Sequence, residues 1–132
     1  MLHVAIRKRL NSDGVSGFGN DLIRLDSHMI TIMDLSGRIS LSAESARLRD
    51  VIAEVIASGS KKVLLNLAGV HYIDSAGLGE LVSAFTSMRR AGGEIRLLNV
   101  TKHVNDLLVI TKLVTVFHVS DDEAEAIDSF RT

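Results

Sequence analysis

The feature that most constrains this chain is an alternation of strand-like and helix-like apolar segments that starts at residue 29. Residues 63–67 form a nearly continuous apolar run, which is typical of a strand covered on both faces of a sheet. Residues 48–56 instead carry apolar side chains at helical spacing, with charged residues on the opposite side. Strands that alternate with helices predict an α/β layer structure.

The boundaries of the expected elements depend on glycine, because the sequence has ten glycines and no proline. Gly37 is expected to end the second strand and Gly59 the first helix. Residues 11–27 are expected to form an extended loop or a hairpin insertion, with residues 22–25 as a short strand and 27–28 as a turn. We expect strands over residues 2–9 (at a sheet edge), 29–35, 63–67, 94–98 and 115–119, and helices capped or begun near Ser42, Ser75, Thr101 and Ser120.

Length, composition and charge restrict the class of protein. The 132 residues, 46% of them hydrophobic, fit a single domain over residues 1–132. The chain has no cysteine, which excludes cysteine-based redox and metal chemistry and fits a reducing cytosol. Its net charge of −1 gives no case for a nucleic-acid partner, and no apolar run approaches the roughly 20 residues that span a bilayer. The first basic residues follow the apolar ones, the reverse of a signal peptide, so we expect a cytoplasmic protein.

The run Tyr72–Gly79 carries the strongest functional signal, because it places the hydroxyl of Ser75 at the start of a helix. The first amide groups of a helix lack intrahelical acceptors and carry partial positive charge. A phosphate on Ser75 would be stabilised there, which makes Ser75 a candidate switch. The simpler interpretation is that Ser75 only caps the helix, as most serines at such positions do.

Other chemistry at this run is weakly supported. A nucleophilic serine needs a base, and His71 has no orienting carboxylate nearby in the sequence, while the Gly-x-Ser-x-Gly elbow of hydrolases is absent. The histidines show no metal-ligand spacing, so we expect neither a metal nor a cofactor. Gly77 and Gly79 lack the third glycine of a dinucleotide fingerprint and the Lys-Ser/Thr of a P-loop.

The first turn of this helix is bare, in the sense that it has almost no large side chains. This feature has two interpretations of equal weight. Glycine inside a helix costs about 1 kcal/mol relative to alanine, so Gly79 needs a reason. The small residues Ala76, Gly77 and Gly79 either let the helix pack tightly on its own sheet or form a flat docking surface around Ser75.

Several motifs together resemble the STAS domain, and within it the bacterial anti-sigma factor antagonists. They are Val63-Leu64-Leu65-Asn66-Leu67, Ile73-Asp74-Ser75-Ala76-Gly77-Leu78-Gly79, Gly92-Gly93-Glu94-Ile95-Arg96-Leu97 and the segment Leu113–Phe117. The resemblance covers roughly residues 29–130 and includes the quite specific Asp-Ser-x-Gly-Leu-Gly core. It implies a STAS-like α/β fold, with a mixed sheet of about five strands and about four helices, in the same element order that the periodicity predicts.

The resemblance implies a partner-switching function and no enzymatic activity. Unphosphorylated Ser75 would lie in the surface that binds an anti-sigma factor with serine kinase activity, and this binding would free a sigma factor. The kinase would phosphorylate Ser75 to end the interaction, and a metal-dependent serine phosphatase would reset it. Asp74 would shape the turn. The contact surface implied is Asp74, Ser75, Ala76, Gly77, Leu78 and Gly79, with Arg38 and Ser40 adjacent.

The sequence departs from the family in two places and leaves alternatives open. Many antagonists carry an acid three residues after the glycine that corresponds to Gly37, where this chain has Ser40, and the connection over residues 11–27 is longer than usual. There are two alternatives. One is a STAS module that acts in a scaffold or transport complex without phosphorylation, and the other is a nucleotide-sensing STAS module. An exposed edge strand also leaves a homodimer open.

Overall fold

The computed structural model describes residues 2–10, 29–40 and 43–130. Its centre is a five-stranded sheet in the order β1-β2-β3-β4-β5, in which β1 is antiparallel to β2 and the remaining neighbours are parallel. The strands are β1 (His3–Leu10), β2 (Met29–Ile39), β3 (Lys62–Ile73), β4 (Glu94–Leu98) and β5 (Val119–Ser120). The expected mixed α/β sheet of five strands is thus confirmed, with β1 at its edge.

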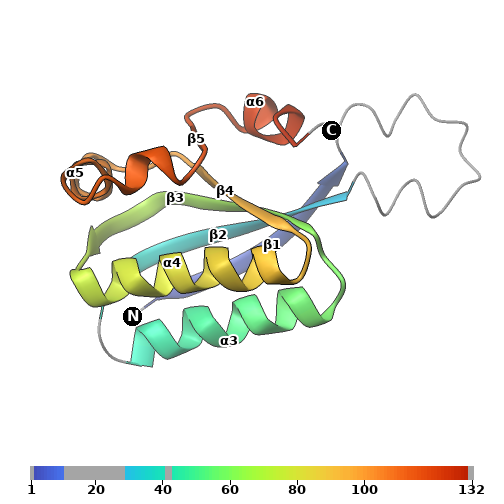
Figure 1. Cartoon of the computed structure of the whole chain (residues 1–132), viewed down its shortest axis with the longest axis horizontal. Coiled ribbons are helices and arrows are strands. Elements are labelled where there is room, and N and C mark those ends of the chain that lie inside the picture. Colours follow the sequence, from blue (N-terminus) through green and yellow to red (C-terminus); the bar gives the residue numbers. More distant parts are fainter. Residues whose placement is uncertain (1, 11–28, 41–42, 131–132) are drawn as a thin grey trace, which may run out of the picture.

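Four α-helices of the described residues complete the fold. They are α3 (Ala43–Ala57), α4 (Ser75–Arg90), α5 (Lys102–Ile110) and α6 (Glu123–Asp128), with a 3-10 turn, η1 (Leu113–Thr115), after α5. Figure 1 shows α3 and α4 side by side along one face of the sheet and α6 over the opposite face. None of the helices in the described part of the chain has the length and apolar character needed to cross a bilayer.

The core lies on both faces of the sheet, as the apolar run 63–67 predicts. On the face of α3 and α4, Leu65 and Leu67 pack in a large cluster with Leu48, Leu81 and other buried side chains. On the opposite face, a smaller cluster joins the sheet to α6 and comprises Ile30, Ile32, Leu64, Leu98, Ala126, Ile127 and Phe130. β3 contributes to both clusters because successive side chains of a strand point to opposite faces.

β2 and β3 run further than the sequence predicts. Gly37 does not end β2: it adopts a positive φ of 109° at an irregularity in the β2–β3 ladder, and the strand continues to Ile39. β3 likewise continues to Ile73, since Arg38 pairs with Tyr72 and Ile39 with Ile73 beyond the irregularity. This extension places the ends of both strands against the start of α4.

The C-terminal elements also differ from expectation. The strand expected over residues 115–119 is mostly absent: β5 comprises Val119 and Ser120, and η1 precedes it. Ser120 does not cap the last helix, because Asp122 does so by accepting a hydrogen bond from the backbone N–H of Glu125. Some of the expected features lie outside the described residues. They are the strand over residues 22–25, the turn at 27–28, the rest of the 11–27 segment and the Ser42 cap.

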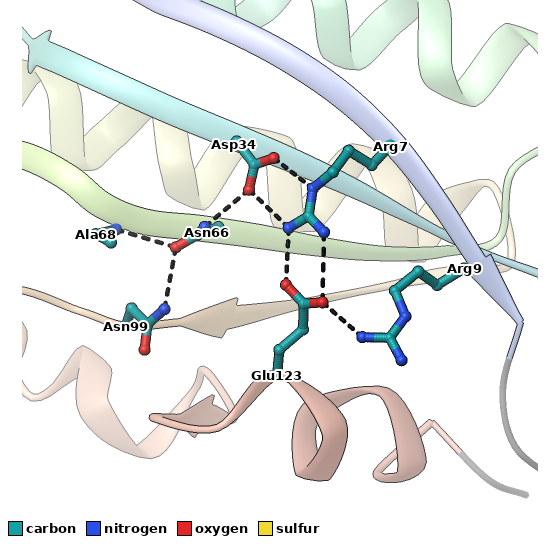
Figure 2. A network of polar contacts seen from close by, with 7 residues as sticks. All are labelled: Arg7, Arg9, Asp34, Asn66, Ala68, Asn99 and Glu123. Atoms are coloured by element: carbon teal, nitrogen blue, oxygen red, sulfur yellow. Dashed lines mark hydrogen bonds and ion pairs between the residues drawn. The ribbon is translucent and has the colours of Figure 1, made fainter.

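A polar network ties β1 to α6 on the face opposite α3 and α4 (Figure 2). The Arg7 guanidinium donates hydrogen bonds to both Asp34, at 2.6 and 3.0 Å, and Glu123, at 2.7 Å. Arg9 adds a 2.6 Å bond to Glu123, and the Asn66 amide donates to Asp34 at 2.7 Å. The network therefore links the first strand, the sheet centre and the last helix.

We predict that acid destabilises the protein through this network. Hydrogen bonds from Arg7 hold the pKa of the Asp34 carboxyl below its ordinary value, and bonds from Arg7 and then Arg9 do the same for Glu123. Carboxyls with lowered folded-state pKa values stabilise the fold when ionised, and this contribution is lost as the pH falls toward those values. The wild type should therefore lose more stability between about pH 6 and about pH 3 than the Asp34→Asn/Glu123→Gln variant. Thermal unfolding at each pH measures this difference.

Asp106→Asn is the matched control for this prediction. Asp106 pairs with Lys102 on the exposed surface of α5, where an ion pair contributes little to stability. This variant should keep the wild-type pH dependence. An equal loss of stability in the wild type and the double variant would show that the network does not contribute.

Candidate functional site

Asp74 sets the start of α4. It is the N-cap, with φ −102° and ψ −179°, and its carboxylate accepts a 2.7 Å hydrogen bond from the backbone N–H of Gly77. Its carbonyl accepts the first helical bond, from Leu78 at 2.8 Å. The helix therefore begins at Ser75, as predicted, and the interpretation that Ser75 itself is the cap is wrong. Asp74 therefore shapes the turn at the start of α4.

Ser75 is exposed at the first position of α4. Because Asp74 supplies the capping oxygen, the Ser75 hydroxyl is not needed for capping. The N-terminal end of α4 carries partial positive charge, and the first turn of this helix contains no acidic side chain. The position can thus accept a negatively charged group on the hydroxyl. The described residues contain no cluster of His, Cys, Asp or Glu suited to a metal.

Gly77 and Gly79 have different roles. A Cβ on Gly77 would overlap the carbonyl oxygen of Ile39 and lie 2.6 Å from its carbonyl carbon, so Gly77 is required for close packing of α4 on the end of β2. A Cβ on Gly79 would meet nothing within 4 Å, and Gly79 is exposed. Tight packing on the sheet therefore explains Gly77, whereas Gly79 is exposed and has no packing role, so the docking interpretation stays a prediction for it.

The other residues of the predicted contact surface also differ in whether they are buried or exposed. Leu78 is 5% exposed and packs in the core, and Gly77 is buried, so neither forms part of the accessible surface. Ala76 is half-buried beside the exposed Ser75. The accessible part of the turn is therefore Ser75, Ala76 and Gly79, with Asp74 half-buried at its base.

The strand extensions bring the end of β2 to this turn. The Ile39 carbonyl accepts a 3.3 Å hydrogen bond from the backbone N–H of Asp74. Arg38, exposed, and Ser40, half-buried, flank Ile39 and thus lie beside the start of α4. Both residues predicted from the Gly37 segment are therefore next to the backbone group that contacts Asp74, while the Arg38 side chain points to the face opposite α4.

Tyr72 and His103 lie beside Arg38, although the predicted contact surface includes neither of them. The Arg38 guanidinium carbon sits 4.5 Å from the centre of the Tyr72 ring, whose other neighbour is His103, with ring centroids 5.5 Å apart and planes at 15°. His103 Nε2 lies 3.3 Å from the carbonyl oxygen of Ile73, the residue before Asp74. These three side chains, here named the Arg38–Tyr72–His103 stack, come from β2, β3 and α5. The pairing of β2 with β3 brings Tyr72 beside Arg38, and the packing of α5 on β3 adds His103.

Comparison with known proteins identifies related chains. Residues 23–126 match the sequence model of the STAS domain. An anti-sigma-B factor antagonist of Staphylococcus aureus is 30% identical over 74 residues, which cover 56% of this chain and 68% of that protein.

Solved structures show the same fold. A Thermotoga maritima protein provisionally named as an anti-sigma factor antagonist is 25% identical with a TM-score of 0.71, over 78% of this chain and 88% of that one. The Bacillus cell fate determinant SpoIIAA, solved in its phosphorylated form, is 21% identical with a TM-score of 0.60, over 77% of this chain and 91% of that one. The second likeness concerns the fold alone.

Proposed function

This chain belongs to the STAS domain family, and on that premise we propose that it is an anti-sigma factor antagonist controlled by phosphorylation of Ser75. In its unphosphorylated form it binds an anti-sigma factor and so releases a sigma factor in the cytoplasm. The observation that carries the proposal is the exposed Ser75 hydroxyl at the first position of α4, left available because Asp74 caps the helix.

Phosphorylation of Ser75 would change the charge of the docking surface. A phosphoserine adds about −1.5 to −2 charges, which the amide groups at the start of α4 can stabilise within the protein. A partner that packs closely on Ser75, Ala76 and Gly79 would have to desolvate that charge. The modified protein therefore stays folded while it loses its partner.

The chain supplies the substrate of this reaction, and its partners supply the catalysis. The anti-sigma factor acts as a serine kinase with ATP, and a metal-dependent serine phosphatase removes the phosphate. One observation in favour is that a relative is named an anti-sigma-B factor antagonist. SpoIIAA, a protein of the same fold, is known in a phosphorylated form.

Phosphotransfer tests this proposal. The wild type is incubated with ATP and each purified anti-sigma factor encoded in the same genome, and the product is mapped by peptide mass spectrometry. We expect one phosphate on Ser75, absent from Ser75→Ala and retained in Ser83→Ala, since Ser83 is an exposed serine of the same helix. No phosphate from any of these factors, or a phosphate on another residue, would contradict the proposal.

A further inference from the structure

The Arg38–Tyr72–His103 stack presents a cation next to the Ser75 turn. Resting on the proposed function, we infer that Arg38, held on the Tyr72 ring, is a second contact of the partner-binding surface and receives a carboxylate side chain of the anti-sigma factor. Three features of the molecule support this role: the contacts within the stack, the charge of Arg38 and the continuity of this surface with Ser75.

The three side chains of the stack contact one another in the absence of a partner. Tyr72 has Arg38 at 4.5 Å and His103 stacked at 5.5 Å, yet the residue remains 37% exposed. His103 is in turn placed by its ring nitrogen, 3.3 Å from the Ile73 carbonyl oxygen. Side chains that already contact one another in their bound arrangement lose less entropy on binding, and tyrosine and arginine are enriched among residues that dominate interface energies.

Among the described residues, Arg38 has no ion pair of the kind that several other arginines make. Arg7, Arg49 and Arg96 each bind a carboxylate within 3.0 Å. Within the described ranges, no carboxylate forms a salt bridge with Arg38, whose recorded contact is with the uncharged Tyr72 ring. A guanidinium stacked on a ring still has its N–H groups at its edge, in the planar geometry that matches a carboxylate. The chemistry of this position therefore favours an acidic group from outside the chain.

The stack is continuous with the Ser75 turn around the end of the sheet. Ile39 and Ile73 are buried in the core beneath α3 and α4, so their neighbours Arg38 and Tyr72 point to the other face. The backbone between the two surfaces is tied by the hydrogen bond from Asp74 to Ile39. A partner that docks on Ser75 can therefore also reach Arg38 across the ends of β2 and β3.

Charge reversal tests this inference. The affinity of the anti-sigma factor that binds the wild type is measured by calorimetry for Arg38→Glu, Arg38→Gln and Arg90→Glu. Arg90 is an exposed arginine at the far end of α4, so its reversal changes the net charge equally without touching the stack. We expect a loss of about 100-fold for Arg38→Glu and about tenfold for Arg38→Gln, with Arg90→Glu close to the wild type. Thermal unfolding of each variant verifies that it is folded.

A charge swap identifies the partner group. Acidic residues of the anti-sigma factor are changed in turn to lysine, and one such change should restore binding of Arg38→Glu. Wild-type affinity in both Arg38 variants would overturn the inference and leave the proposed function standing. If no anti-sigma factor of the genome binds the wild type, the proposed function fails and the inference fails with it.

Discussion

Gly77→Ala is expected to lower the free energy of unfolding by about 3 kcal/mol, because the new methyl group has no space to occupy. It would overlap the Ile39 carbonyl, a backbone group that cannot rotate away. That carbonyl is also held by its hydrogen bond from Asp74. Either the end of β2 or the start of α4 must therefore move.

Thermal unfolding measures this effect, with Gly79→Ala as the matched control. We expect a melting temperature about 10 °C lower for Gly77→Ala. Gly79→Ala should instead stabilise α4 by about 1 kcal/mol, because its Cβ meets nothing and alanine is the better helix former. It should nevertheless weaken partner binding, since the methyl group stands on the proposed docking surface. Equal stability of the two variants would refute the separate roles of the glycines.

Ser75→Asp is expected to weaken binding of the anti-sigma factor about 100-fold, because a buried, unpaired charge is costly in an interface. Ser75→Ala should bind like the wild type, since the Ser75 hydroxyl is not required to cap the helix. Ser83→Asp adds the same charge on an exposed position two turns along α4 and should leave binding unchanged. Calorimetry on the purified proteins measures all three affinities.

The outcome for Ser75→Asp separates a switch from a passive surface. If it binds as tightly as Ser75→Ala, negative charge at this position does not control the partner. A STAS module that uses the same surface without phosphorylation would then be the better description. Equal loss in Ser75→Asp and Ser83→Asp would indicate a general effect of charge rather than a site.

Much of the fold could be predicted where one local signal dominates. The apolar run 63–67 and the strand at Glu94–Leu98 needed only periodicity, and the start of α4 needed only the Asp74-Ser75 sequence. The sequence alone does not distinguish the two interpretations of the first turn of α4. Gly77 and Gly79 are alike in sequence and differ only in what lies opposite them, which is the Ile39 carbonyl for Gly77.

The elements that could not be predicted depend on contacts distant in sequence. Gly37 resembles a strand end, but its positive φ allows the irregularity after which β2 pairs with β3 again. β5 is short because it pairs only with Leu97 and Leu98 of β4. The position of His103 beside Tyr72 arises when α5 packs along the end of β3. No local sequence pattern predicts these contacts.

The affinity of one anti-sigma factor for two forms of this protein tests the central claim most directly. One form carries serine at position 75 and the other phosphoserine, incorporated during translation so that the comparison needs no kinase. We predict that the phosphorylated form keeps the unfolding temperature of the unmodified protein and binds at least about 100-fold more weakly. Equal affinities of the two folded forms would contradict the account.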